Sequence, residues 1–96
     1  MKILALEKEI AGKTAVDFTP FLEEEAKTAW ELQKQGVLRE IYFRADKREA
    51  VLILECDNVI DAEKILQQLP LVREKLIKFD IIPLKPYDGF ERLISG

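Results

Sequence analysis

The hydrophobic and polar positions of the chain follow two periodicities in turn, and this alternation predicts both strands and helices. The most apolar stretch is Ala50–Cys56, in which leucine and β-branched side chains follow one another between charged residues. Such a run is typical of a strand buried on both faces. We therefore expect this stretch to lie in the middle of a sheet.

Three further stretches have the pattern of strands, at 2–10, 37–45 and 77–84. The 37–45 stretch carries several charged side chains, and the 77–84 stretch contains Pro83, which cannot donate to a sheet ladder. Both features suit the edge of a sheet. We therefore expect 2–10 and 50–56 at the centre of the sheet, with the other two strands at its edges.

A first helix is predicted between the strands at 2–10 and 37–45. Thr19 and Pro20 favour its start, and Gly36 favours its end. The acidic run Glu23–Glu25 complements the helix dipole near the start and is expected to be solvated. The helical periodicity places these residues on or beside the buried face: Phe18, Phe21, Leu22, Ala26, Ala29, Leu32 and Gln33.

A second helix is predicted between the strands at 50–56 and 77–84. Asp57 or Asn58 is the expected N-cap, and Pro70 is expected to stop the helix. Its buried stripe is predicted to consist of Val59, Ala62, Ile65, Leu66 and Leu69.

The element order β-α-β-β-α-β predicts one α+β domain over residues 1–96, with a ferredoxin-like fold. Right-handed crossovers give a four-stranded antiparallel or mixed sheet with both helices on one face. Because the stretch at 50–56 is apolar on both faces, the other face needs a cover. A second copy of the chain is the simplest one, so we expect a homodimer or a higher homo-oligomer.

Composition and charge exclude several function classes. The net charge of −3 argues against nucleic-acid binding, which needs a basic face. The absence of histidine excludes imidazole metal sites and triads with a histidine base, and we expect neither a metal nor a cofactor. No apolar stretch approaches the roughly 20 residues that span a bilayer, so we expect a cytoplasmic protein without a membrane partner. The lone Cys56 is expected to be a small buried hydrophobe.

The candidate chemistry lies on the edge strand at 37–45 and its neighbour. Pairing Arg44 with Ala50 would place Arg39 opposite Glu55 and would avoid a contact between two glutamates. The pair of Arg39 and Glu55 could be a site in which the arginine holds an anion and the glutamate is a base, or it could be a structural salt bridge.

Tyr42 and Arg44 form an alternative pair of a donor and a cation on the opposite face of the strand. Alternatively, Tyr42 is a structural side chain at the sheet margin and Arg44 is solvated. Trp30, on the flank of the first helix, could cap the core edge, line the mouth of a pocket or meet another subunit. The tail at 85–94 carries large apolar side chains and is expected to dock on a surface.

Short motifs along the chain resemble muconolactone isomerase and its small relatives in the dimeric α/β-barrel superfamily. They are the helix end Trp30–Gly36, the following strand with Arg39 and Arg44, the segment Leu69–Leu71, and Pro86. The resemblance implies a proton moved between carbons of a small lactone that carries a carboxylate, which needs an acid–base group and a cation or donor. The candidate groups on the sheet are Glu7, Glu40, Glu55, Asp80, Arg39, Arg44 and Tyr42.

Three functional hypotheses follow. The first is a protein that binds or isomerises a small anionic organic molecule, a lactone or an aromatic acid, without a cofactor. In it Glu55 and Tyr42 are catalytic, and Arg39, Arg44 and Trp30 bind the substrate. The second is a non-catalytic dimeric binding or regulatory module of the same fold. The third is a cofactor-free monooxygenase.

Overall fold

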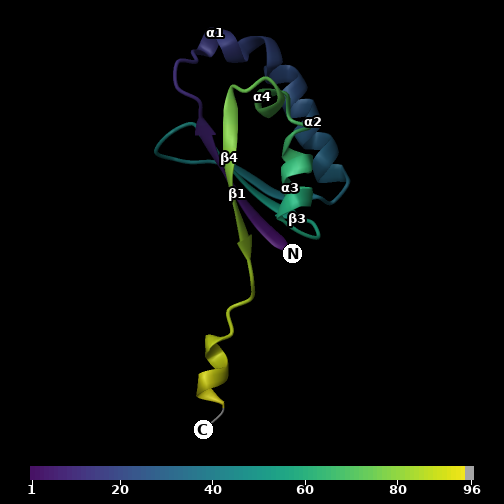
Figure 1. Cartoon of the computed structure of the whole chain (residues 1–96), viewed down its shortest axis with the longest axis vertical. Helices are drawn as coiled ribbons and strands as arrows, with labels where there is room; N and C mark the ends of the chain where they lie inside the picture. Colours follow the sequence, from purple (N-terminus) through teal and green to yellow (C-terminus); the bar gives the residue numbers. More distant parts are fainter. Residues whose placement is uncertain (95–96) are drawn as a thin grey trace.

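The structure is a computed structural model that describes residues 1–94 (Figure 1). Its elements in chain order are β1 (Lys2–Glu9), α1 (Ala15–Phe18), the 3-10 turn η1 (Thr19–Phe21), α2 (Leu22–Lys34), β2 (Leu38–Phe43), β3 (Ala50–Glu55), α3 (Val59–Leu66), α4 (Pro70–Arg73), β4 (Ile77–Leu84) and the 3-10 turn η2 (Gly89–Leu93).

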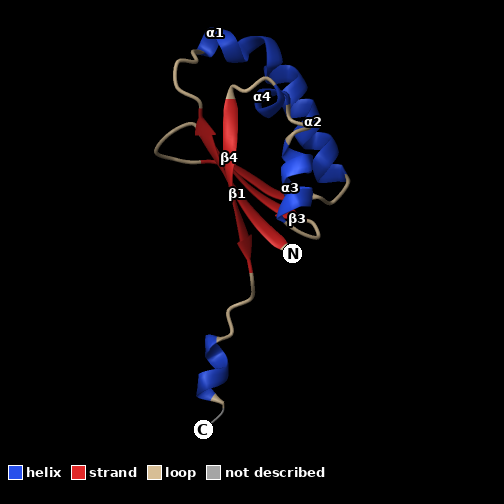
Figure 2. Ribbon diagram, in the orientation of Figure 1, coloured by secondary structure: helices blue, strands red, loops and turns tan. Residues whose placement is uncertain are grey.

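The strands form one antiparallel sheet in the order β2-β3-β1-β4, and the helices lie together against one of its faces (Figure 2). The predicted α+β architecture is therefore confirmed, with β1 and β3 at the centre. None of the helices in the described part of the chain is both long and apolar enough to cross a membrane.

The main core lies between the sheet and the helices. Alternate residues of β1 and β3 point into it, and so do the stripe of α3 and one residue of α2. Its buried residues are Ile3, Ala5, Leu32, Leu38, Leu52, Leu54, Ala62, Leu66 and Leu69. Cys56, predicted to be a small buried hydrophobe, packs against this core but is only partly buried.

The first helical region differs from its prediction in both start and orientation. The chain is already helical from Ala15, because Thr14 and Asp17 form a capping box at the start of α1. Leu22, expected in the core, is 50% exposed, and Ala26 and Gln33 are exposed as well. Phe21, Ala29 and Leu32 face inward as predicted, but Glu25 and Thr28 face inward as well. Glu25 therefore lies half-buried, and its predicted solvation was wrong.

The second helical region matches its prediction more closely. The Asn58 side chain accepts a hydrogen bond from the Asp61 N–H at 2.8 Å, so Asn58 is the N-cap of α3. Pro70 was predicted to stop this helix, but α3 ends at Leu66 and Pro70 begins α4. Proline suits this first position because its missing N–H would have no helical partner there.

The predicted register of β2 was wrong. Phe43, not Arg44, lies opposite Ala50, and an irregularity between Leu38 and Glu40 leaves Arg39 without a directly opposed residue. Buried Leu38 pairs with Leu54 on the helix side of the sheet. Ile41 and Phe43 also lie on the helix side of the sheet. Side chains of a regular strand alternate between its faces, so Leu38 and Ile41 can share a face only because the strand has one extra residue between them.

The sheet face away from the helices has an apolar centre. Leu4 of β1 lies between Ile53 of β3 and Ile82 of β4, and Leu6 lies opposite Val51. All five side chains are partly or largely exposed in the single chain. We call these five residues the open-face patch.

The C-terminal arm, which we define as residues 85–94, extends away from the body of the molecule (Figure 1). Its apolar side chains Tyr87, Phe90, Leu93 and Ile94 are all exposed. The arm therefore does not dock on the chain that carries it.

Candidate functional site

The predicted pair of Glu55 and Arg39 is not a cross-strand pair. The Glu55 carboxylate instead forms an ion pair with the amino group of Met1 at 2.7 Å, and the Arg39 Nε–H donates to the carbonyl of Gly36. The hydrogen bond from the Met1 amino group, with a smaller contribution from the charge of Arg39, lowers the pKa of Glu55. A lowered pKa makes a carboxylate a weaker base.

The other predicted site residues also have local partners. The Tyr42 hydroxyl donates to the Glu40 carboxylate at 2.7 Å, and this bond raises the pKa of Tyr42. Arg44 binds both carboxylate oxygens of Asp46. Trp30 lies on α2 with 59% of its surface exposed. The structure does not gather these side chains around one cavity, and their predicted roles stay predictions.

A different group of residues surrounds a cleft beneath α1. The cleft has a volume of about 270 Å³ and lies where the end of β1, the start of the helical region and the β2–β3 loop meet. It is lined by Glu9, Lys13, Thr14, Ala15, Phe18, Thr19, Leu22 and Arg48. We call it the α1 cleft.

Two cations at the α1 cleft are available to a ligand. Neither Lys13 nor Arg48 forms an ion pair with any carboxylate within residues 1–94. The Arg48 guanidinium lies 4.4 Å from the centre of the Phe43 ring, a cation–π contact that orients it. The cleft thus combines two cations and the carboxylate of Glu9 with an apolar wall formed by Phe18 and Leu22.

The hydroxyl groups in the cleft already have partners. The Thr14 hydroxyl donates to Asp17 at 3.3 Å, and the Thr19 hydroxyl donates to the carbonyl of Ala15 at 2.8 Å. Both bonds lie within residues 14–19, where they support the short α1. The threonine hydroxyls are therefore already hydrogen-bonded, whereas the charged groups of Glu9, Lys13 and Arg48 form no ion pair within residues 1–94.

Behind the cleft, Glu7 is buried with only 7% of its surface exposed. It lies two residues before Glu9 on the same face of β1, and its carboxylate accepts a hydrogen bond from the Ala50 N–H at 3.0 Å. Burial raises the pKa of Glu7, and the charges of Glu9 and Glu49 add to the rise, while that of Arg48 opposes it. Two residues that line the cleft, Glu9 and Arg48, thus act on Glu7 directly.

Glu25 of α2 is a second inward-facing carboxyl group near Glu7. Its carboxylate accepts a hydrogen bond from the Leu71 N–H at the start of α4, at 2.9 Å. Burial is the largest cause of its raised pKa, and the negative charge of Glu7 adds to it. Burial and repulsion by neighbouring carboxylates thus raise the pKa of both carboxyl groups, and a raised pKa makes a carboxylate a stronger base.

Sequence reasoning placed Glu7 among seven candidates on the sheet and did not single out Glu25 or Arg48. A signal for Glu7 existed, because it shares the alternating face of β1 with Ile3 and Ala5, which are both fully buried. No comparable signal marked Glu25, which looks like one of three solvated acids. In the described part of the chain, no cluster of metal-ligating residues is present.

Comparison with known proteins extends these observations. A family model described as muconolactone delta-isomerase matches residues 9–89. The crystal structure of a muconolactone isomerase superimposes with a TM-score of 0.74 at 19% sequence identity, covering 93% of this chain and 93% of that one. At that identity the structural match concerns the fold alone. No curated protein matches the chain.

Proposed function

Because the chain belongs to the muconolactone delta-isomerase family, we propose that it binds a small organic anion in the α1 cleft and isomerises it without a cofactor. The expected substrates are lactones that carry a carboxylate, or aromatic acids of similar size. The observation that carries the proposal is the α1 cleft itself, where two unpaired cations meet an apolar wall beside a buried glutamate.

Binding follows from the charges and the shape of the cleft. Arg48 and Lys13 would hold the carboxylate of the ligand, and Phe18 and Leu22 would contact its apolar part. A charge-assisted hydrogen bond contributes about 1.5–3 kcal/mol, which corresponds to roughly 10- to 100-fold in affinity. The resemblance to the family supports such a ligand, since a muconolactone carries both a ring and a carboxylate.

The isomerisation step would use Glu7. Its carboxylate would take a proton from one carbon of the lactone and return the proton to another carbon, so that a double bond moves and no oxidant or reductant is consumed. The raised pKa of Glu7 makes its carboxylate a stronger base than an exposed one and keeps the protonated form accessible for the return step. Arg48 would stabilise the negative charge that develops on the lactone oxygen.

The test combines ligand binding with proton exchange. Muconolactone and other carboxylate-bearing lactones are added to the protein in D₂O, and NMR follows the incorporation of deuterium at carbon. The wild-type protein is expected to gain thermal stability with a ligand and to catalyse exchange. Glu7→Gln should keep the binding and lose the exchange by at least about 100-fold. Arg48→Gln should weaken binding by about 10- to 100-fold, whereas Lys64→Gln, on exposed α3, should not.

Each other outcome has a defined meaning. Equal weakening by Arg48→Gln and Lys64→Gln would show that the ligand does not occupy the α1 cleft. Binding at the cleft without exchange for any lactone would favour the non-catalytic binding module. Oxygen consumption with a phenolic ligand, in place of exchange, would favour the cofactor-free monooxygenase.

The open-face patch supports a homodimer as part of this proposal. Leu4, Leu6, Val51, Ile53 and Ile82 form a contiguous apolar surface on the face that no helix covers. A second copy that places its own patch against this one would remove both from water with two-fold symmetry. The α1 cleft lies on the helix side of the sheet, so such a dimer would leave the entrance to the cleft accessible.

A further inference from the structure

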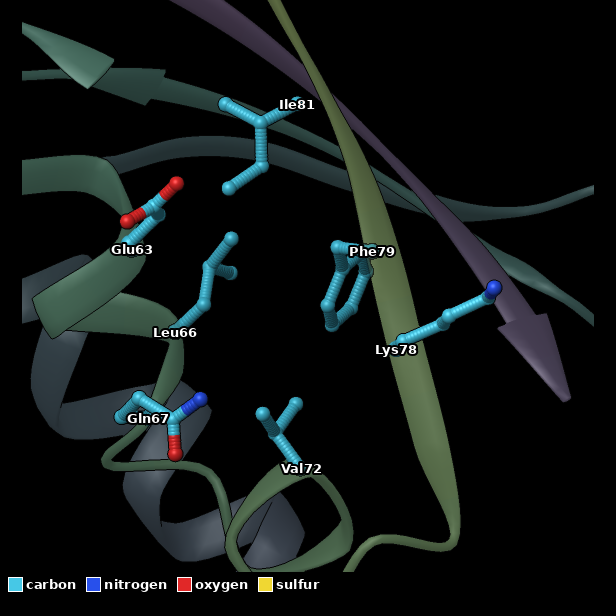
Figure 3. A pocket seen from close by; sticks show the side chains of 7 residues that line it. All are labelled: Glu63, Leu66, Gln67, Val72, Lys78, Phe79 and Ile81. Atoms are coloured by element: carbon cyan, nitrogen blue, oxygen red, sulfur yellow. The ribbon is translucent and has the colours of Figure 1, made fainter. Parts of the chain in front are cut away.

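A second cavity, of about 190 Å³, lies between α3, α4 and β4 (Figure 3). Leu66, Val72, Phe79 and Ile81 are its apolar walls, and the polar side chains of Glu63 on α3 and of Gln67 just after α3 lie across from Phe79 on β4 (Figure 3). The full lining consists of Glu63, Leu66, Gln67, Val72, Lys78, Phe79 and Ile81. We call it the α3–β4 cavity, and it is separate from the α1 cleft.

The C-terminal arm carries an apolar feature that matches this cavity. The rings of Tyr87 and Phe90 meet edge to face, with their centres 4.9 Å apart. The Tyr87 ring also packs directly on Gly89, where a Cβ atom would lie only 2.1 Å from the tyrosine oxygen. These three residues form what we call the aromatic knob. It is preorganised, yet its rings are 71% and 68% exposed.

The chemistry of the knob and the cavity is complementary. An aromatic ring with a polar tip fits an apolar cavity that has polar groups at its mouth. Within the described residues, the Tyr87 hydroxyl has no hydrogen-bond partner, and neither do the side chains of Glu63 and Gln67. In a docked arrangement, Glu63 or Gln67 would accept a hydrogen bond from the Tyr87 hydroxyl, and Arg92 on η2 would carry a cation to the same region.

The direction of the arm argues against docking on its own chain. The arm leaves the end of β4 and extends away from α3 and α4 (Figure 1). Pro86 has a fixed φ angle and restricts Lys85 to an extended conformation, so the chain is directed onward at the point where it would need to reverse. The aromatic knob is therefore presented to another molecule.

We propose that the aromatic knob of one chain docks into the α3–β4 cavity of a second copy. The knob would bring its exposed rings out of water and fill a cavity that the single chain leaves open. The contact is heterologous, because the arm of one copy meets the cavity of another, so it would link chains in addition to any contact through the open-face patch. This inference does not depend on the proposed isomerase activity.

Disulfide trapping between two different chains tests this proposal. Both proteins carry Cys56→Ser, one adds Asp88→Cys beside the knob, and the other adds Gln67→Cys at the cavity. Mixing them under mild oxidation should give the mixed disulfide at least about fivefold faster than when Lys34→Cys, at the exposed end of α2, replaces Gln67→Cys. Thermal unfolding of each variant beforehand confirms that it is folded.

A second variant keeps both aromatic rings of the knob and changes how they pack. Gly89→Ala, added to the Asp88→Cys chain, should reduce the trapping rate to that of the Lys34→Cys control, because the new Cβ displaces the Tyr87 ring. Equal rates at positions 34 and 67, or no effect of Gly89→Ala, would overturn the proposal. So would an intrachain disulfide in a highly diluted protein that carries both Asp88→Cys and Gln67→Cys, since this would place the arm on its own chain.

Discussion

The side chain of Glu7 continues the pairing of β1 with β3 beyond the last pair of opposed residues, Leu6 and Val51. Its carboxylate accepts the hydrogen bond of the Ala50 N–H at 3.0 Å, in a position that is almost closed to water. An ionisable group on the central strand β1 is thus held by a backbone hydrogen bond from β3. This arrangement links the stability of the fold to the chemistry proposed for the α1 cleft.

We predict that Glu7→Gln stabilises the fold at high pH and not at low pH. Because the pKa of Glu7 is raised above the ordinary value of 4.5 in the folded chain, the folded chain binds more protons than the unfolded one just above that pH. Its contribution to stability is therefore full below pH 4.5 and decreases as the pH rises through the folded pKa. Glutamine stays neutral and can still accept the Ala50 N–H.

Thermal unfolding of the wild type and Glu7→Gln between pH 4 and 8 checks this prediction. The difference in midpoint should be small at pH 4 and should grow in favour of Glu7→Gln toward pH 8. Glu23→Gln, an exposed position on α2, is the control and should show no such growth. A difference that stays constant over the whole range would contradict the prediction.

We predict that Glu25→Ala is less stable than Glu25→Gln by about 1 kcal/mol, within a range of about 0.5–1.5 kcal/mol. Both substitutions remove the charge near Glu7, but only glutamine leaves an acceptor for the Leu71 N–H at the start of α4. Urea denaturation of the two variants gives the difference directly. Equal stabilities would mean that water satisfies this N–H as well as the side chain does.

We predict that Leu54→Ala lowers the free energy of unfolding by about 2–5 kcal/mol, because a fully buried side chain would leave a cavity in the main core. Ile60→Ala on α3 removes a side chain that is 63% exposed. It should change the free energy of unfolding by no more than about 0.5 kcal/mol. Chemical denaturation measures both, and similar losses in the two variants would contradict the described burial.

We predict that Ile53→Lys on the open-face patch converts a dimer to a monomer. A lysine in the centre of an apolar interface would have to leave water without a partner, whereas Ile60→Lys adds the same charge to the exposed face of α3. Light scattering after size-exclusion chromatography gives the mass of each variant. A wild-type mass equal to the chain mass, or a dimer that survives Ile53→Lys, would refute the predicted interface.

The strand order was predictable because central strands and edge strands differ in their amino-acid sequence. The apolar run of β3 indicated a central strand, and Pro83 in β4 indicated an edge. The N-cap of α3 was narrowed to Asp57 or Asn58, because a capping side chain acts on backbone groups only three residues away, and the structure has Asn58 there. Such features depend on contacts between residues close in sequence, or on whether a side chain is buried or exposed to water.

The register of β2 and the orientation of α2 were not predictable from the same pattern. The irregularity at Arg39 shifts the pairing of the strand so that Leu38 can reach the core, and a strict alternation of faces contains no sign of it. On α2, the competing apolar residue Leu22 faces outward while Glu25 faces inward. The sheet and α4 select that face, and they are distant in sequence.

By itself the sequence determined the order of the elements, the central and edge strands, and the family to which the chain is similar. These follow from periodicity and from short motifs, which act locally. Only the tertiary structure decided that Glu7 and Glu25 share one buried region, that Lys13 and Arg48 meet at the α1 cleft, and that Glu55 and Arg44 have other partners. The reason is physical, because the charge state and availability of a side chain depend on neighbours that folding brings from distant parts of the chain.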